Sequence, residues 1–151
     1  VSLPMLDKLA IAGYVPNRAT LAHGREVVDA LSLYPALPDT SMRFFSGGNQ
    51  QKAVIGKWLK RRQKIYIFSE PTTGVDVGAI RQIYEIMLEM AKDGASIILI
   101  STSFKELLSL CDRIIVIHNG RVSVEALRSE FTHDSLLAAT LGADPSNPIA
   151  V

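Results

Sequence analysis

The spacing of apolar residues predicts a helical, loop-rich segment over residues 1–40. The residues that recur there at helical spacing are Leu21, Gly24, Val28 and Leu31. Pro35 and Pro38 come next and mark the exit from that helix. A second helical stretch is predicted to open at Ser46, because Val54 and Trp58 form an apolar pair four residues apart.

From residue 65 onward, short apolar runs alternate with amphipathic stretches. Residues 65–68 and 96–100 are apolar runs of the kind found in parallel strands that are covered on both faces. Asp76 is the predicted N-cap of a helix that runs from about residue 78 to residue 92. A further helix follows the second strand, so two successive βα units predict a parallel sheet with right-handed crossovers.

The last third of the chain carries a strong hairpin signal. Asn119-Gly120 separates the apolar run 114–118 from residues 121–124, and this dipeptide accepts the positive φ values of a type I′ turn. The hairpin is expected to add an antiparallel edge to the parallel sheet. Thr132 is predicted to cap a final helix that ends at Gly142, and residues 143–151 are predicted to be a disordered tail.

A cluster of basic residues lies at the end of the predicted helix that follows Ser46. Its members are Lys57, Lys60, Arg61, Arg62 and Lys64. An anionic partner is one interpretation. The favoured one is a solvated helix end, because cations complement the carbonyl-rich terminus of a helix.

The composition limits the classes of protein to consider. A chain of 151 residues with 48% hydrophobic residues is long enough for one domain with a core. The net charge of +1 offers no field that favours nucleic acid or a membrane surface. Cys111 is the single cysteine, so the chain forms no internal disulfide, and this usage fits a reducing, cytosolic compartment.

The ends of the chain and its apolar runs add two further expectations. The run at its beginning, Val1-Ser2-Leu3-Pro4, has no methionine and no signal-peptide pattern, which is consistent with a piece of a longer protein. No apolar run approaches the roughly 18 residues of a spanning helix. We therefore expect a soluble chain whose membrane role, if it has one, goes through a partner.

Ser46-Gly47-Gly48, at the mouth of a predicted helix, forms a candidate site for an anion. Two adjacent glycines leave bare backbone N–H groups, the helix terminus adds partial positive charge, and the Ser46 hydroxyl adds a donor. These features suit a phosphate oxygen. Taken alone, the three residues are better explained as a plain turn into a helix.

Glu70 directly follows the first buried strand. Open α/β sheets bind their ligands at the carboxyl ends of parallel strands, and a carboxylate there could position a water for attack on a γ-phosphate. The alternative is that Glu70 only caps the turn before Pro71.

Residues 45–52, Phe45-Ser46-Gly47-Gly48-Asn49-Gln50-Gln51-Lys52, resemble the signature motif of ATP-binding cassette (ABC) proteins. The Ser-Gly-Gly-Asn-Gln-Gln-Lys form is typical of tandem-cassette importers for simple sugars and nucleosides. Residues 65–70 look like the Walker B strand, residues 73–79 like the D-loop, and Ser101-Thr102-Ser103 falls at the switch region. Residues 111–122 resemble the closing strand pair. The matches run in order over about residues 41–125.

The resemblance implies an α/β fold: a partial ABC ATPase fold with a parallel sheet, flanking helices, a small helical subdomain and a closing β-hairpin. Residues 1–44 would be part of the helical subdomain, although the stretch before residue 41 fits only loosely. Residues 45–142 would hold the signature helix and the carboxy-terminal part of the ATPase core, followed by the tail at 143–151. The implied position in the parent protein is the carboxy-terminal part of the second cassette.

The chain departs from the family pattern at three places. It contains no Gly-x-x-x-x-Gly-Lys-Ser/Thr loop, and its one Gly-Lys pair, Gly56-Lys57, lies in a predicted helix. Ser69 replaces the usual Walker B aspartate, so no metal ligand is assigned, because a hydroxyl is a weak partner for Mg²⁺. Thr102 replaces the usual switch histidine.

The resemblance also implies roles and partners. Glu70 would be the catalytic base, and the nucleotide-contacting residues would be Ser46, Gly47, Gly48, Asn49, Gln50, Asp76 and Thr102. The cofactors would be ATP and Mg²⁺, shared with a second ATP-binding cassette that pairs head-to-tail. Transmembrane permease subunits and, indirectly, a substrate-binding protein would be further partners, with no nucleic acid. The implied location is cytoplasmic, on the inner face of the cell membrane.

The predicted function is therefore to supply the signature, Walker B strand, D-loop and switch region for ATP hydrolysis coupled to import of a simple sugar. Alone, the chain is predicted to be inactive because it lacks the Walker A loop. One alternative is a non-catalytic, degenerate cassette with a docking or regulatory role, which Ser69 favours. Another is a DNA-maintenance ATPase, which the absence of sustained heptads disfavours. The residues do not indicate which sugar or nucleoside is carried.

Overall fold

The computed structural model describes residues 2–58, 61 and 63–142. The predicted tail at 143–151 and two cations of the predicted basic cluster, Lys60 and Arg62, lie outside these residues. The chain divides into two compact units, one made of Val1–Ile67 with Pro71–Ile98 and the other of Phe68–Glu70 with Leu99–Val151. We describe each unit by itself.

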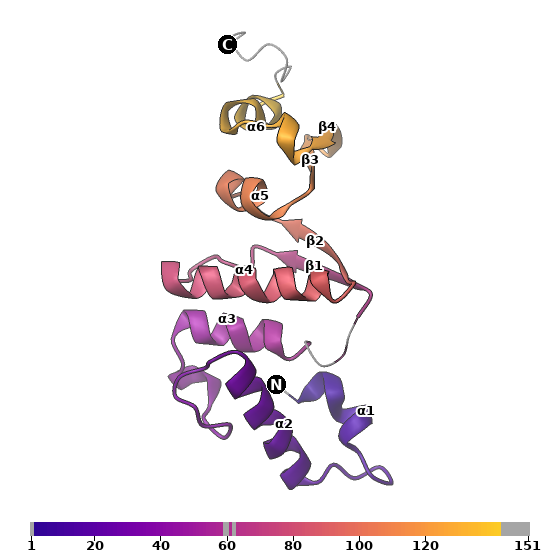
Figure 1. Ribbon diagram of the computed structural model, residues 1–151, viewed down its shortest axis with the longest axis vertical. Coiled ribbons are helices and arrows are strands. Elements are labelled where there is room, and N and C mark those ends of the chain that lie inside the picture. The colour runs from indigo at the N-terminus through magenta and orange to yellow at the C-terminus, as the bar shows by residue number, and fades with distance from the viewer. Residues whose placement is uncertain (1, 59–60, 62, 143–151) are drawn as a thin grey trace. The chain divides into compact units, whose positions relative to one another are not determined.

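The first unit is largely helical (Figure 1). Its helices are η1 (Leu3–Met5), α1 (Leu6–Leu9), α2 (Asn17–Ala30), η2 (Met42–Phe44), α3 (Gly47–Gly56) and α4 (Val77–Lys92). The predicted helices at residues 1–40 and after Ser46 are confirmed, with α3 packed between α2 and α4. Gly56 of α3 lies against Leu31 and Val27, which lets α2 and α3 approach closely. The buried faces of these helices form the core of this unit.

The two predicted strands are β1 (Ile65–Ser69) and β2 (Ser96–Ile100), which pair in a two-stranded sheet. They run parallel, because Lys64 O accepts from Ser96 N at 2.8 Å near their starts and Ile100 O accepts from Glu70 N at 2.8 Å near their ends. The expectation that both faces are covered was wrong. Ile67 is 66% exposed and Ile100 is 53% exposed, because no element among the described residues covers their face of the sheet.

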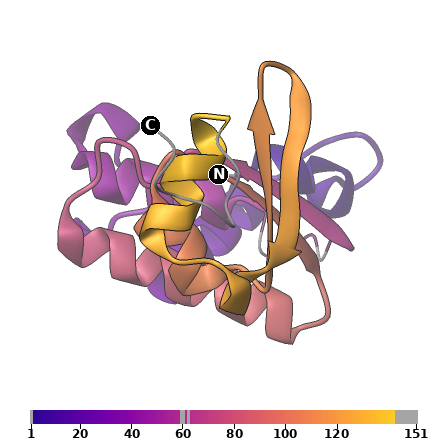
Figure 2. The ribbon, with the colours of Figure 1, turned by 90° about the horizontal axis from the view of Figure 1, so that it is seen from above.

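The second unit is built on α5 (Phe104–Leu110), β3 (Arg113–His118), β4 (Arg121–Leu127), η4 (Arg128–Glu130) and α6 (His133–Thr140). The predicted hairpin is confirmed: β3 and β4 pair antiparallel, from Arg113 opposite Leu127 to His118 opposite Arg121. The turn residues have the predicted positive φ, 49° at Asn119 and 73° at Gly120. Figures 1 and 2 show α6 beside this hairpin.

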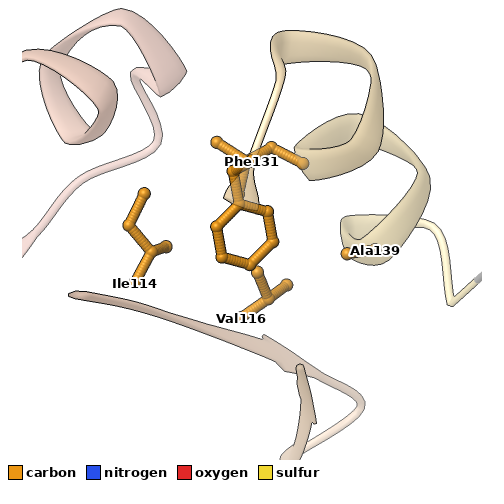
Figure 3. Close-up of a cluster of buried hydrophobic side chains, with 5 residues drawn as sticks. Ile114, Val116, Phe131 and Ala139 are labelled. Atoms are coloured by element: carbon orange, nitrogen blue, oxygen red, sulfur yellow. The ribbon is translucent and has the colours of Figure 1, made fainter. Parts of the chain in front are cut away.

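The hairpin differs from the prediction in one respect. Within the described part of the chain, β3 and β4 pair only with each other and form a separate sheet. The turn at Asn119-Gly120 specifies that β3 and β4 pair with each other, but it does not specify a further strand at their edge. The hairpin's inner face packs onto α6. Ile114 and Val116 of β3 meet Phe131, Leu136 and Ala139 in a buried cluster (Figure 3).

The predicted ends of α6 are confirmed by its hydrogen bonds. The Thr132 Oγ1 accepts from Ser135 N at 3.1 Å, and the Ser135 Oγ accepts from Thr132 N at 2.8 Å, so the two residues form a reciprocal cap. Gly142 follows the helix with φ of 81°, a conformation in which glycine avoids the strain of a Cβ.

Cys111 packs against the hairpin cluster and is half-buried, as expected for an ordinary core cysteine. Burial raises the pKa of its thiol above the ordinary value of 9.0, and the carboxylates of Asp112 and Glu106 raise it further. A raised pKa means that the thiol's contribution to stability is complete below the unfolded pKa and is lost as pH rises through the folded pKa.

We therefore expect Cys111 to react slowly with iodoacetamide at pH 8, because the thiolate is the nucleophile. The rate should rise with a midpoint above that of an unfolded peptide containing the same cysteine. Asp112→Asn should move the midpoint down, whereas Glu89→Gln, which removes an exposed acid of α4 in the other unit, should not. A Cys111 midpoint equal to that of the peptide would contradict the burial argument.

Candidate functional site

Ser46 and Gly47 are exposed where α3 begins. Ser46 is the N-cap, with extended backbone, and its Oγ accepts from Asn49 N at 3.3 Å. The first backbone N–H groups of a helix have no partner within the helix and point out of its end. The predicted anion site therefore lies at a helix terminus with a serine cap and glycines at its first two positions, and its binding of an anion stays a prediction.

The side-chain amides of the next two signature residues bond to the backbone of their own unit. The Asn49 Nδ2 donates to Tyr34 O at 2.9 Å, and the Gln50 Nε2 donates to Phe45 O at 2.9 Å. Both amides thus attach the start of α3 to neighbouring backbone in the same unit. Their predicted contact with a nucleotide stays a prediction.

Gly48 is buried against the start of α4. A Cβ at this position would lie 2.6 Å from the Cβ of Ala79 and 3.0 Å from the Oδ2 of Asp76. The other carboxylate oxygen of Asp76 accepts from Ala79 N at 3.0 Å, which confirms the predicted N-cap. We call residues 46–48 together with residues 74–79 the signature corner.

Lys52 of α3 is buried, which was not predicted from the sequence. It is only 4% exposed, and its Nζ donates to Leu31 O at 3.1 Å, Ser32 O at 3.2 Å and the Gln82 Oε1 at 2.9 Å. Burial lowers the pKa of its ammonium group, while the Asp76 carboxylate opposes that shift. The available signal was spacing: Lys52 lies midway between Gly48 and Gly56, four residues from each, on one helix face.

Glu70 and Thr102 meet at the carboxyl ends of the paired strands. Glu70 follows β1 with φ of 47°, and its Oε1 accepts from Thr102 N at 2.8 Å. Residues separated by 32 positions in the chain are thereby joined at the edge where parallel sheets bind ligands. A backbone N–H on one oxygen fixes the orientation of the carboxylate, and the role of Glu70 as a catalytic base stays a prediction.

These geometries can be compared with known proteins. No family model matches the chain. It is 38% identical over 142 residues to the ribose import ATP-binding protein RbsA of Geobacillus kaustophilus (strain HTA426), a match that covers 94% of this chain and 29% of that protein. It is 39% identical over 142 residues to RbsA of Bacillus subtilis (strain 168), with the same coverage of 94% and 29%. This chain is homologous to part of the ABC import cassettes. It spans less than a third of the length of these relatives.

Solved structures of ATP-binding cassettes share the fold of this chain. An ATP-binding cassette of an ABC transporter in its ADP conformation superimposes with a TM-score of 0.68 at 21% identity, covering 91% of this chain and 56% of that one. A dimeric cassette in a post-hydrolysis state with ADP and phosphate gives 0.70 at 21% identity, covering 85% and 54%. The predicted α/β fold of an ABC ATPase, with a parallel sheet and flanking helices, is confirmed.

The resemblance to ABC proteins implies Mg²⁺ at the end of β1. At the end of β1 the candidate donors are the exposed Ser69 hydroxyl and Glu70, whose Oε1 already accepts from Thr102 N. Mg²⁺ favours carboxylate and phosphate oxygens in an octahedral arrangement. Among the described residues, no group of three or more His, Cys, Asp or Glu could hold a metal ion. This donor set does not fit Mg²⁺.

No helix in the described part of the chain combines the length and apolar character that crossing a membrane requires.

Proposed function

We propose that this chain is the signature-bearing part of the ATP-binding subunit of an importer for a simple sugar, from the carboxy-terminal part of the second cassette. One observation carries the proposal: the serine-capped, glycine-led start of α3 is exposed, whereas the rest of the motif is bound to its own unit. Such a terminus can receive a phosphate held by another cassette. The homology to ribose import ATP-binding proteins supports the substrate class.

In this proposal the signature corner completes an ATP site on a partner cassette that pairs head-to-tail. The Ser46 hydroxyl and the first N–H groups of α3 donate to phosphate oxygens, and the helix dipole stabilises their negative charge. The partner supplies the Walker A loop, which this chain lacks. The Asn49 and Gln50 amides and the Asp76 cap hold the corner in place for that contact.

Glu70 is the proposed catalytic base on this chain's own side. Its carboxylate, held by Thr102 N, would orient a water toward a γ-phosphate and take its proton. Because Ser69 stands in place of the aspartate, we propose that this chain's own half-site is weak and that the partner's site does most of the hydrolysis.

The decisive experiment restores the missing carboxylate in the complete ATP-binding protein. Ser69→Asp should raise Mg²⁺-dependent ATP hydrolysis at this half-site at least about tenfold, because a carboxylate adds the ligand that a hard dication prefers. Hydrolysis is measured across a Mg²⁺ titration with the partner's site inactivated. Ser69→Asn, of the same shape without charge, is the control and should give no gain. Unchanged hydrolysis and Mg²⁺ dependence in Ser69→Asp would show that the half-site is not degenerate.

The remaining assignments follow from the proposed role. Transmembrane permease subunits would convert hydrolysis into import, and a substrate-binding protein would act through the permease. The proposed role implies that the chain lies in the cytoplasm, on the inner face of the membrane. The net charge of +1 supports the absence of nucleic acid among its partners.

A second candidate function is a non-catalytic docking or regulatory cassette, which Ser69 and the absent Walker A sequence favour. Purified chain should bind ATP weakly in either case. Mixing it with a cassette that has an intact Walker A loop but an inactivated signature separates the two. Restored hydrolysis supports the proposed function, and no restoration supports the docking role.

A further inference from the structure

Lys52 ends the stretch that resembles the signature motif, yet it is turned away from the exposed start of α3. Its ammonium group is buried, and each of its three N–H donors has an acceptor on this chain. A buried ammonium without such partners would be strongly destabilising, because its charge would lose water and gain nothing in return. The lysine is therefore committed to contacts within its own unit.

The three acceptors belong to different elements. Leu31 O and Ser32 O lie directly after α2, where unpaired carbonyls carry the negative end of the helix dipole. The Gln82 Oε1 lies on α4. One side chain of α3 therefore connects the end of α2 to α4.

Apolar packing alone would leave α3 freer to shift. The contact of Gly56 with Leu31 and Val27 brings α2 and α3 together, but such contacts have little directional preference. The hydrogen bonds of Lys52 are directional, and they lie one helical turn from Gly48. Gly48 in turn has no spare room, since a Cβ there would reach Ala79 at 2.6 Å. A rotation of α3 would thus move the signature corner directly.

We propose that Lys52 is a positioning residue that fixes the signature turn, residues 46–48, against the start of α4. The proposal rests on the proposed function in that the turn is taken to receive a partner's nucleotide. Lys52 itself touches no nucleotide in this arrangement. It acts by restricting the orientation of α3, so that the Ser46 hydroxyl and the first N–H groups keep one direction.

The test uses the complete ATP-binding protein with its permease and compares Lys52→Met with the parent. Methionine keeps the length of the side chain and removes its donors. Amide hydrogen exchange over residues 46–50 should accelerate at least about tenfold at Asn49 and Gln50, whose N–H groups donate to Ser46, because the turn opens more often. Exchange in α6, in the other unit, should be unchanged. The kcat for ATP should fall about tenfold with KM altered less than about twofold, because the Walker A loop of the partner supplies ground-state binding.

Two further variants separate positioning from general stability. Ile83→Val removes a methyl group from a fully buried α4 residue and should lower the melting temperature without faster exchange at residues 46–50. Gln82→Ala removes only one of the three acceptors and should give a smaller effect in the same direction, and it provides the test if Lys52→Met does not fold. Unchanged exchange at residues 46–50 in both Lys52→Met and Gln82→Ala would overturn the proposal, as would equal acceleration in Ile83→Val. A further variant, Ser46→Asp, places a carboxylate where the proposed function puts a phosphate. If exchange accelerates in Lys52→Met but Ser46→Asp leaves hydrolysis at the partner's site intact, the positioning role stands and the proposed function fails.

Discussion

Replacing Ser46 with aspartate in the complete ATP-binding protein is expected to lower hydrolysis at the partner's site at least about 100-fold, because a carboxylate would face the phosphate. The substitution is chosen to leave α3 intact. Ser46 is the N-cap through its Oγ, and aspartate caps helices as well as serine does. The loss would therefore report on the phosphate contact and not on the fold.

The measurement is steady-state ATP hydrolysis with this chain's own half-site inactivated, together with thermal unfolding of each variant. Ser46→Thr, which keeps both the cap and the hydroxyl, should retain hydrolysis within about threefold. Ser109→Asp places the same charge at an exposed serine of α5 and controls for added negative charge. Wild-type hydrolysis in Ser46→Asp would rule out the signature corner as a phosphate site.

The second large effect concerns Gly48, where alanine is expected to destabilise the chain by about 2 kcal/mol through overpacking. The added Cβ would lie 2.6 Å from the Cβ of Ala79, which has no flexible end to move aside. The backbones of α3 and α4 must then separate. Gly47→Ala is the matched control in the same turn, since its Cβ would meet only Gly74 O, at 3.2 Å. Urea unfolding of the three proteins measures the difference.

A compensating change makes this prediction specific. Ala79→Gly removes the atom that blocks a Cβ at Gly48, at a cost of about 1 kcal/mol for glycine within a helix. In the double variant the two changes should cost less than the sum of their separate effects, by about 1 kcal/mol or more. Strict additivity would show that the Gly48–Ala79 contact does not limit substitution. Hydrolysis in the double variant then tests whether the corner also keeps its function.

Much of the fold could be predicted because its signals are local. The cap at Asp76 and the Asn119-Gly120 turn depend on side-chain chemistry within a few residues, and both lie where they were predicted. Apolar periodicity located α2 and α4, whose buried faces repeat at helical spacing. The apolar pair that predicted α3, Val54 and Trp58, was wrong about its buried face, because both side chains are exposed. The resemblance to ABC cassettes rested on the same local runs of residues, and homology supports it.

Other features could not be read locally. The apolar run at residues 65–68 predicted a strand covered on both faces, but coverage depends on which elements pack there, and Ile67 is exposed. The hairpin was expected to extend the parallel sheet, but among the described residues β3 and β4 pair only with each other, and their inner face packs against Phe131. In both cases the local residues determine which strand or hairpin forms. Contacts between elements determine what covers it and what it pairs with.

The candidate site also combines features that depend on local sequence with features that depend on tertiary contacts. The sequence by itself determined which residues are chemically suited to a phosphate and to a proton transfer: a serine with two glycines at a helix start, and Glu70 after a strand. Only the tertiary structure decided that Glu70 is held by Thr102 N, that Gly48 is buried against Ala79, and that Lys52 is buried with three acceptors. The physical reason is that capping and turn preferences act over a few residues, whereas burial and hydrogen bonding join residues that the chain brings together only on folding.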